Sequence, residues 1–349
     1  MDPLTRLLMQ GAASGGPYKG EIALGHSNTP YVSAYPWDAG FGTKFSNPAS
    51  LPPGVCLESN FSSSGADFAV AYQASPRVSV YQWSSSGFGT KYSDPSPAVP
   101  NQARSVAFSP DNASIAIGYI GSAPYVYAYA WSSGSGFGSK LTNPGVNPTG
   151  QVNSIAYTSD SSTVALAHNT SPFVTVLAYS SGTGFGGKYS NPGTLPGGIG
   201  NGVQFSPSDD YIAIAHDASP YITVYPWSVS GFGTKYSNPS TLPPYNGNDV
   251  AWSPLGDAVA VAHADPPYIS VYPWSASGFG TKYSNPATAL GDTARGVSFT
   301  PDGADIAVGA DSSPYIYVYP WDSASGFGAK YSNPATLPPG NIYTVRFSP

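Results

Sequence analysis

The four histidines of the sequence are the first residues that suggest chemistry, because histidine is a common metal ligand. Each ends a short apolar segment of a repeated unit, at His26, His168, His216 and His263. Equivalent positions of a closed repeat lie on a ring, too far apart to share one ion through Zn–N bonds of about 2.0–2.1 Å. The pattern therefore predicts no metal and no other cofactor, and it favours packing or a loop hydrogen bond for each histidine.

A second candidate is a phosphate-binding loop. Gly182, Gly187 and Lys188 have the spacing of that motif, but Tyr189 follows where a serine or threonine would hold magnesium. The segment also leads into an expected strand and not a helix. We interpret it as a product of the repeat that carries no function.

The acidic residues are the third group that could carry chemistry, as part of a catalytic site. The sequence has 19 acidic residues, and many lie in turns, such as Asp111, Asp209, Asp257 and Asp302. Catalysis needs a nucleophile held by a base, or two carboxylates with different pKa values. No single repeat carries an unusual polar cluster, so the sequence predicts a protein that is not an enzyme.

A repeat of about 48 residues organises the whole chain. The string Gly-Phe-Gly-x-Lys occurs seven times, and an aromatic residue followed by serine or threonine recurs with the same spacing. The phenylalanines of the string are Phe41, Phe88, Phe137, Phe185, Phe232, Phe279 and Phe327. A repeat of this length with many short strands is typical of a β-propeller blade. We expect an all-β, seven-bladed propeller.

Each repeat divides into four strands, which we name a to d from the axis outward. In the sixth repeat they are expected at 249–253, 258–263, 268–274 and 281–285, separated by turns rich in Gly, Pro and Asp. Strand b alternates large and small apolar residues, so one blade's bulky face should pack on its neighbour's alanine face. Seven lysines should lie in strand d, where charge protects an edge from pairing; a basic rim that contacts acidic polymers is the alternative. They are Lys44, Lys91, Lys140, Lys188, Lys235, Lys282 and Lys330.

The two ends of the chain predict how the ring closes. The first repeat begins at strand b, residues 21–26, and has no strand a. The chain ends on residues 345–349, which look like a strand a with nothing after it. The first blade should therefore take one strand from the C-terminus and three from the N-terminus. The expected domains are a docking peptide at 1–17 and a propeller at 18–349.

Composition and charge exclude several classes of protein. Charged residues make up 9% of the chain and the formal net charge is −6, so no basic surface exists for nucleic acid. No apolar run approaches the roughly 20 residues of a membrane helix, and no segment resembles a signal peptide. We expect neither nucleic-acid binding nor membrane insertion.

The blade resembles the WD-repeat unit. The resemblance is carried by residues 106–111 (Val-Ala-Phe-Ser-Pro-Asp), by an alanine-rich strand b and by a strand c that ends in tryptophan. The family's Gly-His pair is mostly absent, and Tyr-Pro-Trp replaces its Trp-Asp dipeptide in four blades. The resemblance implies the propeller fold, while the family's hydrogen-bond network and partner specificity do not transfer.

The turns between strands b and c and those between d and a should emerge on one face, which we expect to bind a ligand if any face does. Loops rich in Tyr, Asp and Asn suit adaptable polar recognition, although ordinary loop roles explain each residue equally well. The candidate residues are Tyr31, Tyr125, Tyr221, Tyr268, Tyr315, Asp217, Asp265 and Asp311.

The N-terminal peptide lies outside the repeat. Asp2 and Pro3 can start a short helix whose apolar residues are Leu4, Leu7, Leu8 and Met9, and which would need a surface to dock on. Residues 1–13 resemble the start of bacteriophage tail-fibre-like virion proteins, which implies a docking peptide that carries an interchangeable outer domain.

Together these features predict a non-enzymatic bacteriophage virion module. The peptide would bind other virion proteins of the tail or capsid, and the propeller would face outward for host-surface attachment, to a glycan or a protein, or for subunit contacts. The alternatives are a cytoplasmic bacterial scaffold for protein–protein interaction and a lectin-like propeller with repeated sugar sites.

Overall fold

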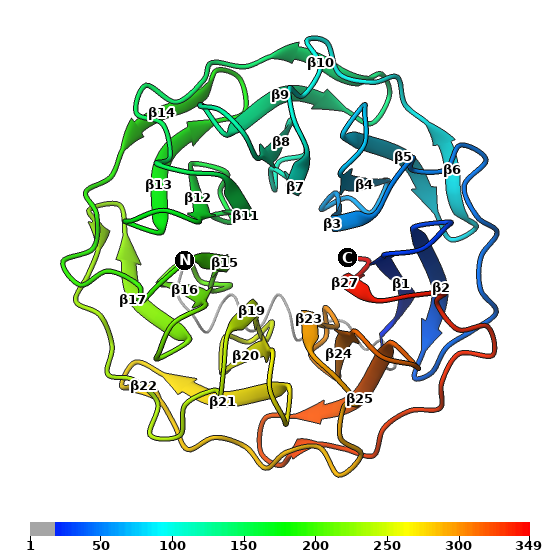
Figure 1. Ribbon diagram of the computed structural model, residues 1–349, viewed down its shortest axis with the longest axis vertical. Coiled ribbons are helices and arrows are strands. Elements are labelled where there is room, and N and C mark those ends of the chain that lie inside the picture. The colour runs from blue at the N-terminus through cyan, green and yellow to red at the C-terminus, as the bar shows by residue number, and fades with distance from the viewer. Residues whose placement is uncertain (1–17) are drawn as a thin grey trace, which may run out of the picture.

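The computed structural model describes residues 18–349, which form a seven-bladed β-propeller (Figure 1). The predicted docking peptide lies outside the described residues. Six blades are four-stranded antiparallel sheets, and the seven blades stand in a ring (Figure 1). A cavity lined by the innermost strands lies on the axis of the ring, and we call this axial space the channel. Fold class and blade number are as predicted from the repeat.

The innermost strands, a, line the channel. They are β27 (Ile342–Phe347), β3 (Cys56–Phe61), β7 (Ala103–Phe108), β11 (Val152–Tyr157), β15 (Gly200–Phe205), β19 (Gly247–Trp252) and β23 (Ala294–Phe299). Strands b follow outward as β1 (Lys19–His26), β4 (Asp67–Tyr72), β8 (Ser114–Tyr119), β12 (Thr163–His168), β16 (Tyr211–His216), β20 (Ala258–His263) and β24 (Asp305–Ala310). Strands c are β2 (Val32–Asp38), β5 (Val78–Ser84), β9 (Val126–Ser132), β13 (Val174–Ser180), β17 (Ile222–Ser228), β21 (Ile269–Ser275) and β25 (Ile316–Asp322).

Blade one closes the ring as predicted. Its sheet has the order β2–β1–β27, so the last strand of the chain pairs with the first. Ile22 lies opposite Phe347 and Leu24 opposite Val345 in this antiparallel pair. Outside β2, the bridge between Trp37 and Phe41 takes the place of a fourth strand.

Strand d differs from the prediction. It has five residues in β6 (Gly87–Lys91), β10 (Gly136–Lys140) and β14 (Gly184–Lys188), but two in β18 (Gly231–Phe232), β22 (Gly278–Phe279) and β26 (Gly326–Phe327). The segment 281–285 is therefore not a strand in blade six. The short strands belong to blades in which strand c carries Tyr-Pro-Trp, and a proline such as Pro273 offers no N–H to continue the ladder. Gln82, Ala130 and Ala178 stand at that position where strand d is long.

The repeated lysines follow the same division. Only Lys91, Lys140 and Lys188 lie within strand d, and the other four follow its end or, in blade one, the bridge at Phe41. Each lysine folds back on its own blade: its Nζ donates to the side chain of the Asn or Asp three residues later. Burial lowers the pKa of Lys44 and of five of its equivalents. The lysines therefore close the turn after the Gly-Phe-Gly string.

The core lies between the blades. Ile212 and Ile214 of β16 pack on blade four, against alanines and valines of β12 and β13. Ala213 and Ala215, on the other face of β16, pack on Val259 and Val261 of blade six. This is the predicted packing of bulky faces on alanine faces. Within the described residues there is no helix able to cross a membrane.

The seam between blades seven and one is held by a buried carboxylate. Asp305, which is 5% exposed, accepts a hydrogen bond from Trp37 Nε1 at 2.9 Å and another from the Tyr331 hydroxyl at 2.8 Å. Asp305→Ala should lower the free energy of unfolding by about 2 kcal/mol, because the buried Trp37 N–H and the partly buried Tyr331 hydroxyl lose their acceptor. Urea denaturation measures the effect. Asp265→Ala, in an exposed turn, is the control and should change stability by less than about 0.5 kcal/mol; equal losses in both variants would contradict the prediction.

Candidate functional site

The four histidines are structural. Each Nε2 lies within hydrogen-bond distance of a serine or threonine hydroxyl on strand c, as in the 3.0 Å contact between His26 and Ser33. His26 Nδ1 and His263 Nδ1 also contact carbonyls of the b–c turns, at 2.7 and 2.8 Å. Burial lowers the pKa of all four histidines to about 4. The expected packing is confirmed for all four histidines, and the expected loop hydrogen bond for His26 and His263, whereas Nδ1 of His168 and of His216 is buried without a partner among the described residues.

The predicted ligand-binding residues do lie together on one face. The b–c and d–a turns meet there, since Ser27 N donates to Asn341 O and Asn28 Nδ2 to Pro339 O. The tyrosines sit in the b–c turns with positive φ, at 68° in Tyr31 and 70° in Tyr268; the equivalents are Tyr125, Tyr221 and Tyr315.

The aspartates of that face have local roles. Asp311 forms a salt bridge with Arg295, and Asp217 accepts a hydrogen bond from Ile199 N at 2.7 Å. Asp265 contributes its backbone carbonyl to the turn, which accepts from Tyr268 N. Ligand binding by this face stays a prediction.

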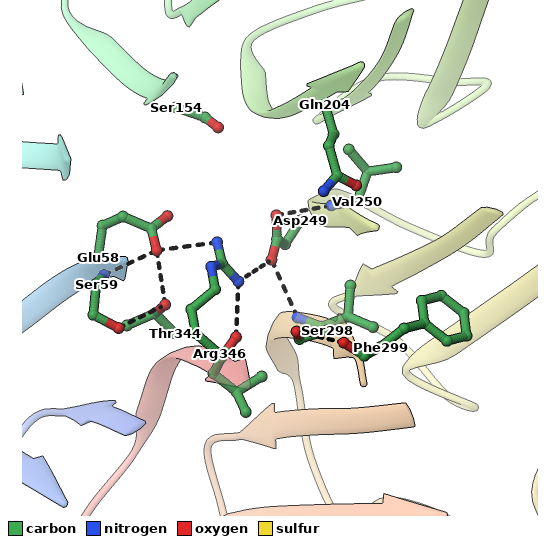
Figure 2. Close-up of polar contacts among 12 residues, drawn as sticks. Glu58, Ser59, Ser154, Gln204, Asp249, Val250, Ser298, Phe299, Thr344 and Arg346 are labelled. Atoms are coloured by element: carbon green, nitrogen blue, oxygen red, sulfur yellow. Dashed lines mark hydrogen bonds and ion pairs between the residues drawn. The ribbon is translucent and has the colours of Figure 1, made fainter. Parts of the chain in front are cut away.

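A different polar cluster lies inside the channel, and three blades supply it. Glu58 of β3, Asp249 of β19 and Arg346 of β27 point toward one another (Figure 2). Arg346 Nη2 lies 3.1 Å from Glu58 Oε1, and Arg346 Nη1 lies 3.7 Å from Asp249 Oδ2. The side chains of Arg346, Glu58 and Asp249 are 23%, 17% and 16% exposed, so all three reach solvent in the channel while most of their surface is covered. We call these three residues the axial cluster.

Glu58 fixes the arginine. Besides the contact with Arg346, its Oε1 accepts hydrogen bonds from the Thr344 hydroxyl at 2.7 Å and from Ser59 N at 2.9 Å. Thr344 and Arg346 both belong to β27, so Glu58 holds this strand at two points. Glu58 and Asp249 outweigh the effect of burial and raise the pKa of Arg346, which therefore stays a cation.

Asp249 is held by backbone amides and is unusually basic. Its Oδ1 accepts from Val250 N at 2.9 Å, and its Oδ2 accepts from Val297 N of the next blade at 3.1 Å. Burial raises its pKa from 3.8 to about 6, against the opposing effect of Arg346. Gly202 stands at the equivalent position of blade five, where a Cβ would lie 3.1 Å from Asp249 Oδ1. The glycine leaves room for this carboxylate in the inter-blade space.

The axial cluster borders a cavity of about 410 Å³. Strands a form its wall, and turns between strands a and b, with Pro110, Pro207, Pro254 and Pro301, form its rim. The cavity therefore opens on the face opposite the b–c turns. Ser154 of β11 and Gln204 of β15 lie on neighbouring strands of the same wall (Figure 2). A volume of this size accommodates a small organic molecule.

Sequence reasoning missed the axial cluster because it searched for chemistry within one blade. The sequence did contain a signal. Glu58 and Asp249 occupy the same position of strand a, where the other blades have Ser, Thr or Gly. Arg346 occupies a second position of strand a, where the other blades have neutral residues. In a propeller these positions converge on the axis. The absence of an unusual cluster within a blade was therefore no ground to exclude catalysis.

Comparisons with known proteins place the chain by structure alone. No family model matches it, and no curated protein matches it. Among solved structures it is similar to two proteins titled "putative 6-phosphogluconolactonase", from Bacteroides fragilis and Bacteroides uniformis. Each of these two proteins is 10% identical to this chain, with a TM-score of 0.72. The match covers 99% of each of them, and it covers 96% of this chain for the Bacteroides fragilis protein and 94% for the Bacteroides uniformis protein. It is also similar to the periplasmic gluconolactonase of Pseudomonas aeruginosa, with 14% identity, a TM-score of 0.70, and coverage of 95% of this chain and 99% of that one.

At this level of identity the likeness shows the fold. The names of these neighbours nevertheless contradict two predictions made from the sequence. Propellers that match over nearly the full length of both chains are named as lactonases, so the prediction of a non-enzymatic bacteriophage virion module is wrong, and so is the prediction that the chain is not an enzyme.

Proposed function

We propose that this propeller hydrolyses small lactones, of the sugar-lactone type, in its axial cavity. The observation that carries the proposal is the axial cluster: a carboxylate with a pKa of about 6 beside a guanidinium, on the wall of a cavity of about 410 Å³. The names of the structural neighbours support the choice of substrate class. The resemblance of the blade to WD repeats adds nothing to this proposal.

Asp249 is suited to act as the general base. A carboxylate with a pKa near 6 is ionised at neutral pH and holds a proton better than an ordinary aspartate. It takes a proton from water while the water oxygen forms a bond to the lactone carbonyl carbon. The π electrons of the carbonyl move onto its oxygen. When the intermediate collapses, the ring C–O bond breaks and Asp249 returns the proton to the leaving alkoxide, which gives the open hydroxy acid.

Arg346 is suited to stabilise the oxyanion. Its contacts with Glu58 and with Val345 O use one N–H on each terminal nitrogen. A guanidinium has five N–H donors, so others can donate to an oxygen in the cavity. Charge that develops near such a preorganised donor is stabilised by several kcal/mol when the site is shielded from water. Glu58 is a positioning residue in this scheme, because it holds the guanidinium and does not contact the substrate.

Acid release from a panel of sugar δ- and γ-lactones tests the proposal, with spontaneous hydrolysis subtracted. Because only the carboxylate form of Asp249 accepts a proton, kcat/KM should rise about tenfold per pH unit below about 6 and level off above it. A profile without an inflection between pH 5 and 7 would contradict the role of Asp249. No hydrolysis above background across the panel would reject the proposed function.

A further inference from the structure

The charges on the wall of the axial cavity are unevenly divided. The carboxylates of Glu58, Asp209 and Asp249 line it, and within residues 18–349 Arg346 is the one cation on the wall. Arg346 lies between Glu58 and Asp249, at 3.1 and 3.7 Å. Asp209, on the rim, accepts a hydrogen bond from the Ser159 hydroxyl at 2.6 Å. Because Asp249 is mostly ionised above a pH of about 6, the wall carries a net negative charge at neutral pH, and its cation is already shared by two carboxylates.

The fifth residue of every strand a lines this cavity, at the level of Arg346. Around the ring from blade one, these residues are Arg346, Asn60, Ala107, Ala156, Gln204, Ala251 and Ser298. The alanines of blades three and four leave room and offer a small apolar surface, and Asn60 and Gln204 stand on either side of them. A ring-shaped molecule that rests on these two alanines therefore meets a carboxamide on each side.

Gln204 turns its amide nitrogen toward the cavity. Its Oε1 accepts a hydrogen bond from Trp252 N at 2.7 Å, and because a backbone N–H needs an acceptor, this contact identifies the oxygen end of the amide. Figure 2 shows the side chain reaching from β15 toward Asp249. Nε2 makes no hydrogen bond with any of residues 18–349 and is not a buried atom. Its two N–H groups are therefore open to the cavity, beside the proposed general base.

Asn60 offers a second uncommitted amide. It follows Glu58 by two residues on β3 and is partly exposed on the wall of the cavity. Its side chain makes no hydrogen bond within the described part of the chain, and neither of its polar atoms is buried. An amide side chain both donates and accepts, which matches a hydroxyl group that does the same. The cavity therefore combines neutral hydrogen-bonding groups with an excess of negative charge.

We propose that the cavity selects uncharged polyhydroxy lactones over their phosphorylated counterparts, with Gln204 and Asn60 as the residues that bind the hydroxyl groups. The assignment of the ligand as a lactone rests on the proposed function. A phosphate monoester carries about −1.5 to −2 charges at pH 7, so the net negative wall repels it. It also competes for Arg346, which the carbonyl oxygen of the lactone needs. A lactone without hydroxyls gains nothing from the two amides, which then stay hydrated.

Isothermal titration with glucono-δ-lactam tests this selection without any turnover, because the compound has the ring and hydroxyls of a sugar lactone but a stable C–N bond. Its 6-phosphate adds only the charge, and δ-valerolactam lacks the hydroxyls. The full chain should bind glucono-δ-lactam most tightly and its 6-phosphate about tenfold or more weakly, a difference that added salt should reduce. Gln204→Ala and Asn60→Ala should each weaken binding of glucono-δ-lactam about three- to tenfold, because a neutral hydrogen bond is lost. Alanine stands at this position in three other blades, so the fold should accept both changes.

Gln73→Ala is the matched control, because it removes a carboxamide from an exposed b–c turn and should leave all three affinities unchanged. Melting curves show that each variant is folded. A 6-phosphate that binds as tightly as glucono-δ-lactam overturns the selection against charge. Absent binding of glucono-δ-lactam overturns the whole proposal even where lactone hydrolysis is found, and binding unchanged in either alanine variant overturns the role of that residue. Binding that depends on Gln204 and Asn60 in a chain that hydrolyses no lactone supports the recognition of hydroxyls and rejects the proposed function.

Discussion

Asp249→Asn should reduce kcat for lactone hydrolysis by about 10²- to 10⁴-fold, the usual contribution of a positioned general base. The asparagine has nearly the same shape, and its one oxygen can accept from either Val250 N or Val297 N, while the other N–H loses its acceptor. That loss costs roughly 1–3 kcal/mol, so the fold should persist. Initial rates at pH 7.5, far above the pKa of about 6, give the comparison with the unchanged chain. The pH inflection near 6 should vanish from any residual activity.

The control for this substitution is Asp111→Asn. Asp111 lies in an a–b turn and its carboxylate accepts a hydrogen bond from Ser109 at 2.5 Å, so the same chemical change is made outside the axial cluster. Its turnover should match that of the unchanged chain. If Asp249→Asn also hydrolyses lactones at the full rate, Asp249 is not the base and the mechanism fails.

Arg346→Met should be the most destabilising change in the axial cluster, with a loss of about 3 kcal/mol in the free energy of unfolding at pH 7. The substitution leaves Glu58 and Asp249 covered without their counterion, which costs more than an exposed pair would. The pKa of Asp249 should rise further, because the attraction of Arg346 opposes the effect of burial. Urea denaturation at pH 7 and pH 5 measures the effect.

The pH dependence of that loss identifies its cause. Since the folded-state pKa of Asp249 lies above 3.8, its deprotonation becomes increasingly unfavourable to the fold as pH rises from about 4 to 6. At pH 5 Asp249 is mostly protonated, so Arg346→Met should cost less there than at pH 7. Arg346→Lys, which keeps the charge, should lose less at both values. Equal losses for Arg346→Met at both pH values would indicate lost packing of the arginine stem instead.

The repeat made the fold predictable to the level of single strands. The prediction of strand b in blade six was correct. A run of alternating large and small apolar residues, such as Val259 and Ala260, fits a strand that is buried on both faces. Strand d was misplaced because the effect of Pro273 acts across the sheet: a missing N–H on strand c ends the pairing of its neighbour. A pattern read along the chain does not contain that contact.

The candidate site was predictable only in part. Comparison of the repeats shows that Glu58, Asp249 and Arg346 differ from their equivalents, but their mutual distances depend on closure of the ring. The raised pKa of Asp249 also arises from the covering strands, which no local pattern reports. The packing of the histidines, in contrast, was predictable, because each ends strand b on its bulky apolar face.

The strand that closes the ring also brings the cation of the axial cluster. Glu58 and Asp249 precede Arg346 in the chain by 288 and 97 residues, as their numbers show. During synthesis from the N-terminus, the blades that carry both carboxylates emerge before β27 exists. In the proposed mechanism, a growing chain therefore holds the general base without its oxyanion donor, and it holds two acids without a counterion. Catalytic competence should appear in a single step with circular closure, so that in time-resolved refolding the onset of turnover marks the docking of β27.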